Sequence, residues 1–315
     1  MKVNNHLDLE KPEKPAVVTI GSFDGVHLGH QKVLDDLKTI ANNHGERSVV
    51  ISFEPHPRIF FNPDTDLRLL TTTDEKASLL SQQNIDDLIL QKFDHEFASQ
   101  DAETFVKKLV ETLNMKDLLI GYDHRFGKDR KGTFDFVKSL EQKYGFKTHK
   151  IAPLFINGTE VSSSLIRKIL STGDVRLAQT YLGRPYLLTG RVVKGNRLGR
   201  KLGFPTANIS VDNPYKLIPK QGVYLVKSMI DNQPVFGMMN IGFRPTIDGK
   251  KQIMEIHFFD FNGDLYGKSI PVYFLERLRD EQKFPSLEAL QNQLKKDADL
   301  SRRLISDNYI NSSHN

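Results

Sequence analysis

A run of glycine and histidine near the N-terminus has the composition of a phosphate-binding loop: Gly21-Ser22-Phe23-Asp24-Gly25-Val26-His27-Leu28-Gly29-His30. Its glycines let backbone approach a ligand closely, and the N–H groups at a helix start favour anions. His27 and His30 are expected on one side of the first helical turn. There they can stabilise the charge on a pentavalent phosphorus. A capped helix with two incidental histidines is the alternative, and no third ligand has the spacing of a metal site.

A second patch, Val161-Ser162-Ser163-Ser164-Leu165-Ile166-Arg167, precedes a predicted helix. Serine hydroxyls and the backbone amides of a helix start can bind phosphate, and Arg167 can contact a β- or γ-phosphate with two N–H groups. Taken alone, a serine-capped helix is more often structural. Together with the histidine run it favours a nucleotide site, whose candidate contacts are Gly21, Phe23, Gly29, Ser162, Ser163 and Ser164.

A glycine-rich basic segment, residues 190–208, lies between two predicted strands. It lacks the GxxxxGK[ST] pattern of a Walker A loop, but such a loop can cover phosphates with another geometry. Thr206 and Asn208 offer the hard oxygen ligands that suit Mg²⁺ bound to a nucleotide. A structural turn explains any one of these glycines but not the whole segment. The candidate nucleotide contacts are Gly195, Arg200, Gly203 and Pro205.

Glu255 lies in the strand-like sequence Met254-Glu255-Ile256-His257-Phe258-Phe259, whose apolar residues make a carboxylate conspicuous. A carboxylate beside a hydroxyl nucleophile acts as a general base or orients the hydroxyl. The alternative is a glutamate that only faces solvent on the outside of a sheet. The sequence around Glu255 leaves both interpretations open.

Strands and helices alternate through the first part of the chain, which predicts a parallel sheet in an α/β domain. Ligands of such sheets bind beyond the carboxyl ends of the strands, where the loops after Ile20 and Ile120 lie. The predicted strands are residues 16–21, 48–53, 87–91, 118–121 and 147–152. The predicted helices are residues 30–41, 75–82, 104–113, 134–144 and 164–171.

Residues 187–275 change to short strands joined by turns, which indicates an antiparallel barrel or sandwich. A helix over residues 286–305 follows, with Leu287, Leu290, Leu294, Leu300 and Leu304 on its apolar side. We place the domain boundary near Leu182–Arg184, so the predicted domains are residues 1–182 and 183–315.

The composition of the 315 residues excludes several classes of protein. The absence of cysteine rules out disulfides, thiolate metal sites and cysteine nucleophiles. No apolar run is long enough for a membrane helix, and the N-terminus lacks the apolar core of a secretory signal, so we expect a cytoplasmic protein. The net charge of +5 comes from the part after Leu182. Its basic cluster would attract phosphates; it comprises Arg184, Arg191, Lys194, Arg197, Arg200 and Lys201.

The first of these parts resembles a known enzyme family. GSFDGVHLGH is similar to the first signature of the HxGH nucleotidylyltransferases, and SSSLIR to the second. Residues 54–57 (EPHP) and 121–132 resemble prokaryotic FAD synthetases, the latter their flavin-side segment. The resemblance implies that His27, His30 and Arg167 are catalytic and that Asp123, Arg125 and Phe126 bind flavin. His124 and Ser164 depart from the usual Phe and Thr.

The second part resembles bacterial riboflavin kinase in the segments RPY (184–186), GRKLGFPTAN (199–208), GVY (222–224), NIGFRPT (240–246), the Glu255 strand, DLYG (264–267) and RLRDE (277–281). The resemblance implies that Thr206 and Asn208 bind the Mg-nucleotide and that Glu255 activates the ribityl 5′-hydroxyl. The segment with Arg279 and Phe284 would cover the flavin. Both resemblances together cover nearly the whole chain in the expected order.

Taken together, the two parts make the chain similar to the bifunctional riboflavin kinase/FAD synthetases. The resemblance implies a Rossmann-like nucleotidylyltransferase domain with a parallel sheet and an antiparallel riboflavin-kinase β-barrel with a closing helix. It also implies ATP with Mg²⁺, riboflavin, FMN, FAD and pyrophosphate as ligands, and neither nucleic acid nor membrane as a partner. The sequence carries no signal for an oligomeric state.

Two rival hypotheses remain from the sequence. The basic second half and its small barrel suggest a nucleic-acid-binding protein, whose RNA affinity would depend steeply on salt. Against it, the arginines gather at one glycine-rich loop, and the barrel has no clear aromatic stripe. The second rival is an enzyme with one inactive domain; His124 and Ser164 make the adenylyltransferase the one at risk.

Overall fold

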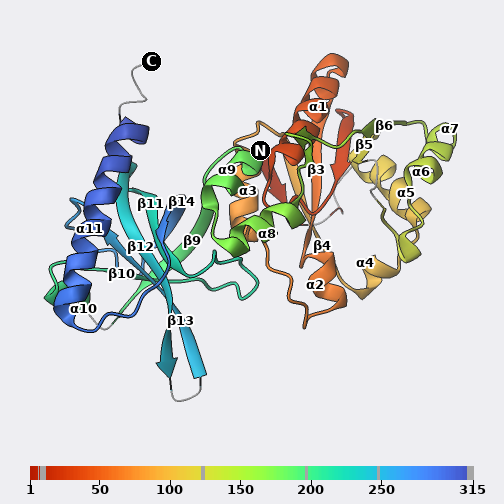
Figure 1. The fold of residues 1–315 in the computed structure, drawn as a ribbon. Coiled ribbons are helices and arrows are strands. Elements are labelled where there is room, and N and C mark those ends of the chain that lie inside the picture. The colour runs from red at the N-terminus through yellow and green to blue at the C-terminus, as the bar shows by residue number, and fades with distance from the viewer. Residues whose placement is uncertain (6, 8–11, 122–124, 196–197, 247–248, 311–315) are drawn as a thin grey trace. The chain divides into compact units, whose positions relative to one another are not determined.

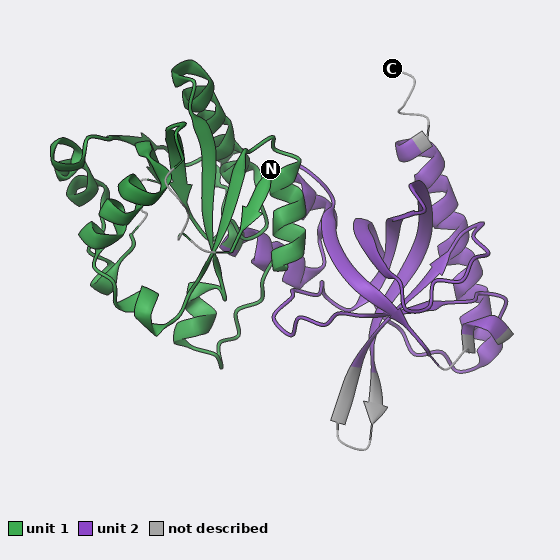
Figure 2. Ribbon diagram, turned by 180° about the vertical axis from the view of Figure 1, so that it is seen from behind, with its two compact units in different colours: residues 1–163 green, residues 164–315 purple. Residues whose placement is uncertain are grey.

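The computed structural model describes the 315 residues except 6, 8–11, 122–124, 196–197, 247–248 and 311–315. The chain divides into two compact units, Met1–Ser163 and Ser164–Asn315, hereafter unit 1 and unit 2 (Figure 2). Helix α8 (Ser163–Thr172) begins at the last residue of unit 1. The functional boundary near Leu182–Arg184 stays a prediction; it falls between α9 (Val175–Leu182) and β9 (Tyr186–Val193) of unit 2.

Unit 1 contains a six-stranded sheet in the order β1-β4-β3-β2-β5-β6 (Figure 1). All neighbouring strands are parallel, which confirms the predicted α/β class. The strands are β1 (Lys2–Asn4), β2 (Ala16–Ile20), β3 (Arg47–Glu54), β4 (Asp87–Lys92), β5 (Met115–Gly121) and β6 (Lys147–Ile151).

The helices of unit 1 cover both faces of this sheet. Val18 and Ile20 of β2 pack with α5 (Ala102–Leu113), whereas Val17 packs with α1 (Leu28–His44) and α3 (Thr73–Ser81). This alternation follows from the two-residue period of a strand. The shorter elements are α2 (Pro57–Phe61), α4 (His95–Ser99), the 3₁₀ turn η1 (Lys128–Arg130), α6 (Phe134–Ser139), α7 (Glu141–Tyr144), and the hairpin of β7 (Phe155–Ile156) and β8 (Thr159–Glu160).

One predicted helix of unit 1 is wrong. The structure divides residues 134–144 into α6 and α7 at Leu140. The N–H of Leu140 donates to the carbonyl of Val137 at 3.0 Å, a bond that tightens the turn and ends the α-helical pattern.

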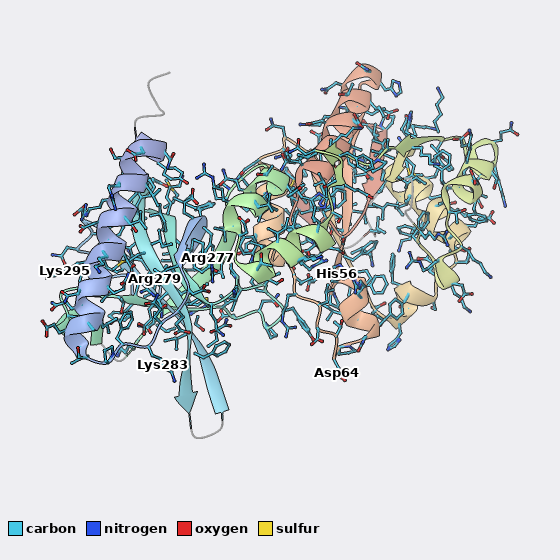
Figure 3. All side chains as sticks on the ribbon, viewed as in Figure 1. His56, Asp64, Arg277, Arg279, Lys283 and Lys295 are labelled. Carbon is cyan, nitrogen blue, oxygen red and sulfur yellow. The ribbon has the colours of Figure 1, made fainter. Side chains whose placement is uncertain are left out.

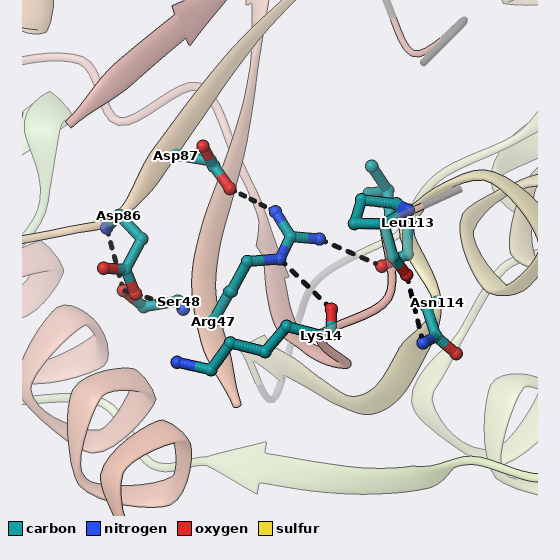
Figure 4. A network of polar contacts seen from close by, with 8 residues as sticks. Lys14, Arg47, Ser48, Asp86, Asp87, Leu113 and Asn114 are labelled. Carbon is teal, nitrogen blue, oxygen red and sulfur yellow. Dashed lines mark hydrogen bonds and ion pairs between the residues drawn. The ribbon is translucent and has the colours of Figure 1, made fainter. Parts of the chain in front are cut away.

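A polar network closes the amino-terminal edge of the sheet (Figure 4). Arg47, the first residue of β3, donates to the carbonyl oxygens of Lys14 and Leu113, each at 3.2 Å, and pairs with Asp87. Next to it, the backbone N–H and the hydroxyl of Ser48 donate to the Asp86 carboxylate at 2.8 Å. These bonds connect four chain segments at the amino edge, and the loops that carry the candidate site residues lie at the opposite, carboxyl edge.

Unit 2 is built around a closed barrel with the strand order β10-β13-β12-β11-β14-β9. Every neighbouring pair is antiparallel, so the structure selects the barrel over the sandwich. The remaining strands are β10 (Ala207–Ser210), β11 (Gly222–Ile230), β12 (Gln233–Thr246), β13 (Gly249–Phe258) and β14 (Ser269–Arg279), and the remaining helices are α10 (Leu198–Lys201), α11 (Leu287–Ile305) and the π-helical turn η2 (Ser306–Ile310).

Helix α11 packs along the barrel, as predicted, but its leucine stripe is partly wrong. Leu287 is 60% exposed, whereas Asp297 is buried. Asp297 accepts hydrogen bonds from Nε and Nη2 of Arg279 on β14, at 3.0 and 2.8 Å. A buried carboxylate is tolerated here because it is paired with Arg279. Among the described residues, no helix combines the length and the apolar character that crossing a bilayer requires.

Candidate active sites

The histidine loop of unit 1 follows β2 at the carboxyl edge of the sheet. His27 is the N-cap of α1, and its Nδ1 accepts a hydrogen bond from the backbone N–H of His30 at 3.3 Å. The two imidazoles stack with their centroids 3.7 Å apart and their planes at 16°. The predicted placement of both rings on one side of the first turn is therefore confirmed.

The segment before α3 fixes the conformation of this loop. The Asp24 carboxylate, buried, accepts the backbone N–H groups of Leu70 and Thr71 at 3.1 and 3.0 Å. The N–H of Gly25 donates to the Thr71 hydroxyl at 3.0 Å. Gly25 has φ +88°, and a Cβ there would lie 2.7 Å from Leu70. A glycine is thus required here by the backbone conformation and by the packing against Leu70.

The serine patch meets the histidine loop within unit 1, although well over a hundred residues separate them. The hydroxyl of Ser163 donates to the carbonyl of Asp24 at 2.8 Å. A Cβ on Gly29 would lie 3.1 Å from the His27 ring and 3.3 Å from the carbonyl of Val161. Gly21, Phe23 and Ser162 belong to the same two segments, whereas Ser164 and Arg167 lie on α8 in unit 2.

An aromatic cavity of about 800 Å³ lies beside the loop in unit 1. Arg125, Phe126 and Ser22 line it, and Figure 3 shows His56, another lining residue, at the start of α2. Asp123, the third predicted flavin contact, lies outside the described residues. Sequence reasoning missed most of the wall, because its phenylalanines come from several elements and share no motif; they include Phe53, Phe61, Phe93, Phe97 and Phe105.

In unit 2 the strand register aligns polar residues across the barrel wall. Asn208 pairs with Glu255, Glu255 with Asn240, Asn240 with Val223, and Val223 with Arg279. Side chains that are paired in register share one face of a sheet. Glu255 therefore stands in a row with a predicted metal ligand and a predicted flavin contact.

Val223, Asn240, Glu255 and Arg279 of this row line a cavity of about 260 Å³ on the face of the barrel that α11 covers, whereas Asn208 is not among the residues that line either barrel cavity. Glu255, Thr206, Arg279 and Phe284 all line this first cavity, and the Arg279 guanidinium lies 5.7 Å from the Phe284 ring centroid. Figure 3 shows Arg279 in its place on β14. The other lining residues were not predicted as site residues, although most of them lie in the segments that carry the resemblance or on the apolar side of the predicted closing helix: Leu202, Phe204, Val223, Asn240, His257, Glu281, Leu290 and Leu294. Met238 and Gln282 lie outside those segments.

A second cavity of unit 2, of about 150 Å³, contains Arg200, Pro205 and Thr206. Ile256 and Phe258 line it, whereas Glu255 and His257 line the first cavity, so β13 separates the two. Thr206 borders both. Two ligands, one in each cavity, would therefore lie next to each other at Thr206. Gly203, with φ +82°, makes the turn that leads from α10 into this segment.

Gly195 provides a direct test of the Asn208 position. A Cβ on Gly195 would lie 2.0 Å from Nδ2 of Asn208, so Gly195→Ala must displace that side chain. We expect the riboflavin phosphorylation that the sequence resemblance implies for this barrel to fall by about tenfold or more, as expected when a ligand group is misplaced. Steady-state kinetics with varied ATP measure it. Gly158→Ala, in the turn between β7 and β8 of unit 1 where an added Cβ meets no atom within 4 Å, is the control; equal losses in both variants would contradict the assignment of Asn208.

A cluster of His44, Glu46 and Asp117 lies at the amino edge of the unit 1 sheet, away from the histidine loop. Nδ1 of His44 lies 3.3 Å from the Asp117 carboxylate, and His149 also contacts Asp117. Burial and then the negative charge of Asp117 raise the pKa of Glu46, against the charges of His44 and Lys116. The folded chain thus binds a proton at Glu46 more tightly than the unfolded chain does.

Glu46→Gln should consequently raise the melting temperature at neutral pH. The ionised Glu46 carboxylate destabilises the fold. This destabilisation is absent below the ordinary glutamate pKa of 4.5, grows as the pH rises above it, and is complete above the raised pKa of Glu46 in the folded chain. Thermal unfolding followed at pH 4 and at pH 7.5 measures the difference. Glu111→Gln on the exposed face of α5 is the control. Equal melting temperatures of Glu46→Gln and the unmodified chain at pH 7.5 would contradict the shift.

Two family models match consecutive parts of the chain. One, described as FAD synthetase, matches residues 9–165 and contains the histidine loop and the aromatic cavity. The other, described as riboflavin kinase, matches residues 182–305 and contains both barrel cavities.

Proteins similar to the chain match it over most of its length. A bifunctional riboflavin kinase/FMN adenylyltransferase of Haemophilus influenzae is 40% identical over 288 residues, which cover 90% of this chain and 92% of the relative. One of Escherichia coli K12 is 37% identical over 290 residues, 91% and 92% of the two chains. A crystal structure described as a macrolide-efflux protein from Streptococcus pneumoniae has a TM-score of 0.86 and 32% identity, and covers 95% of this chain and 98% of that chain.

Proposed function

The chain belongs to the bifunctional riboflavin kinase/FMN adenylyltransferase family, and on that premise we propose which residues carry each of its two reactions. The enzyme phosphorylates riboflavin with ATP to give FMN, and it adenylylates FMN with a second ATP to give FAD and pyrophosphate. We assign the first reaction to the barrel of unit 2 and the second to the loop and the aromatic cavity of unit 1.

The phosphorylation is supported by one observation above all: Thr206 borders two cavities, and Glu255 lies in the more apolar one. The flavin ring would occupy the cavity under α11, beside Phe284, and ATP the cavity of Arg200 and Pro205. The ribityl 5′-hydroxyl oxygen then attacks the γ-phosphorus as its proton passes to the Glu255 carboxylate, and ADP leaves.

The family's kinases use ATP with a divalent metal, and we propose Mg²⁺ as that metal. Thr206 and Asn208 fit it, because residues two apart on an extended segment point the same way and both offer hard oxygen ligands. Bound there, Mg²⁺ would neutralise charge on the nucleotide phosphates. Gly195 keeps the space that Asn208 occupies.

For adenylyl transfer, we assign the stacked imidazoles of His27 and His30 to the phosphates of ATP. A phosphate oxygen of FMN attacks the α-phosphorus, the bond to the β-phosphate breaks, and pyrophosphate leaves. The imidazoles would stabilise the charge that develops in this step, and Arg167, on the motif evidence, would bind the triphosphate. The flavin would lie among the phenylalanines of the aromatic cavity, with Arg125 and Phe126 in its wall.

Chromatography of the products tests the assignment of two working sites. The chain is incubated with ATP, Mg²⁺ and either riboflavin or FMN. We expect FMN and FAD from riboflavin, and FAD from FMN. FAD from FMN without phosphorylation of riboflavin would refute the role of Glu255, and the reverse pattern would refute that of the histidine loop. No turnover together with steeply salt-dependent RNA binding would favour the nucleic-acid-binding rival.

A further inference from the structure

Lys76 is a buried cation that the reactions above do not use. It lies in the first turns of α3 and is 7% exposed. Its Nζ donates to the hydroxyl of Ser52 at 2.7 Å and to the carbonyl of Ser22 at 3.2 Å. Within the described part of the chain, no carboxylate lies within ion-pair distance of this ammonium group. A cation held by neutral oxygens in a low-dielectric interior costs stability.

The electrostatics of Lys76 agree with this geometry. Burial lowers the pKa of Lys76, while the negative charges of Glu54, at the end of β3, and of Asp24, in the histidine loop, act in the opposite direction. The carboxylate of Asp24 is itself hydrogen-bonded to Leu70 and Thr71. Neither carboxylate therefore removes the electrostatic cost of burying Lys76 by direct pairing, so packing alone does not account for a lysine here.

Lys76 acts on the histidine loop through one peptide group, directly and through Ser52. The Ser22 carbonyl accepts from Nζ of Lys76 and also from the Ser52 hydroxyl, at 3.1 Å, to which Lys76 donates. In a trans peptide the C=O and N–H point in opposite directions. Since the Ser22 carbonyl points at Nζ of Lys76, the N–H of Phe23 is directed to the other side of the loop. Phe23 has φ +47°, an uncommon backbone conformation that needs such support. Ser22 also lines the aromatic cavity, so this peptide borders the space where the substrates meet.

We propose that Lys76 is a positioning residue for adenylyl transfer. Its ammonium group holds the Ser22–Phe23 peptide so that the Phe23 N–H faces the phosphates of ATP, and it places a fixed positive charge behind the loop. This inference rests on the function proposed for unit 1. The buried charge lowers the stability of the fold. In return, it orients the loop before the nucleotide binds, so that the loop does not have to reorganise during the reaction.

Lys76→Met tests the proposal, because methionine has a similar length and carries neither charge nor donor. We expect kcat/KM for ATP in FAD formation from FMN to fall about 10²-fold, close to the effect of losing one preorganised donor. Phosphorylation of riboflavin by the same sample should be unchanged. The melting temperature should stay the same or rise, because the variant no longer buries a charge. A residue with only a structural role would lose activity and stability together.

Three further measurements separate positioning from structure. Lys76→Arg, which keeps the charge and the donors, should retain more adenylyl transfer than Lys76→Met. In the unmodified chain the rate of FAD formation should fall at alkaline pH as Lys76 loses its proton, at a lower pH than that at which an exposed lysine titrates. This alkaline decrease in rate should be absent from Lys76→Met. Lys107→Met makes the same chemical change on the exposed surface of α5 and should leave both reactions unchanged.

Two results distinguish failure of this inference from failure of the function beneath it. Normal FAD formation by Lys76→Met, or a loss matched by unfolding and not relieved in Lys76→Arg, would overturn the role of Lys76 alone. An unmodified chain that makes no FAD from FMN would overturn the function proposed for unit 1, and the inference with it.

Discussion

Glu255→Gln is expected to reduce the formation of FMN from riboflavin by about 10²- to 10⁴-fold, the usual contribution of a general base. Glutamine keeps the shape of the side chain and removes its capacity to take the hydroxyl proton. Glu255 lies on the face of β13 that borders the cavity, half-buried, and the apolar residues Met254 and Ile256 on the other face stay in place. The fold should therefore be retained, and conversion of FMN to FAD should be unchanged.

The measurement is the initial rate of FMN formation at saturating ATP and riboflavin, with riboflavin affinity determined separately by flavin fluorescence. Glu281→Gln is the matched control, because it removes one negative charge from the wall of the same cavity. If Glu281→Gln lowered the rate as much as Glu255→Gln does, the loss would reflect cavity charge and not a base. An equal loss of FAD formation from FMN would refute the division of the two reactions between the units.

The second large effect is expected at His27, where two substitutions separate catalysis from folding. His27→Asn should lower FAD formation from FMN by about 10²- to 10³-fold, as expected for lost transition-state contacts, and leave riboflavin phosphorylation unchanged. Asparagine is a good N-cap, so it can replace the bond that His27 makes to the N–H of His30. His27→Ala loses the imidazole and the cap together, and should in addition be less stable by about 1 kcal/mol.

Steady-state rates of the two reactions and thermal unfolding of both variants separate the loss of the imidazole from the loss of the helix cap. His44→Asn, at the far end of the same helix, is the control for replacing a histidine and should spare both reactions. Full adenylyl transfer by His27→Asn would show that His27 is a cap and nothing more. Loss of both reactions in a folded His27→Asn would contradict the assignment of this loop to one reaction.

Local pattern alone predicted most of the elements and the chemistry that they carry. The apolar run over Ala16–Ile20, the helix that follows His27, and the alternation of strands and helices specify a parallel sheet, since burial on both faces demands such runs. The HxGH loop, the serine patch, the basic glycine-rich segment and Glu255 were recognisable because each places its chemical groups within a few consecutive residues. The closing helix was predicted over residues 286–305 and lies at Leu287–Ile305, with Ser286 as its N-cap.

Contacts between residues far apart in the sequence determine the features of unit 2 that no local sequence pattern predicted. Closure of the barrel depends on β10, a strand of four residues whose partners β9 and β13 lie on either side of it in sequence. Its register with β13 brings Asn208 beside Glu255. In the same way, Asp297 of α11 can be buried because Arg279, on the distant strand β14, pairs with it.

The interior of unit 1 also depends on contacts between distant segments. The aromatic cavity is lined from β3, α2, α4 and α5, and Lys76 meets Ser22 across 54 residues of chain. No periodicity marks a lysine for burial, because the oxygens that hold it come from other segments. The residues to which we assign the two reactions could therefore be predicted from short motifs. The residues that we propose to orient them depend on contacts that exist only once the chain has folded.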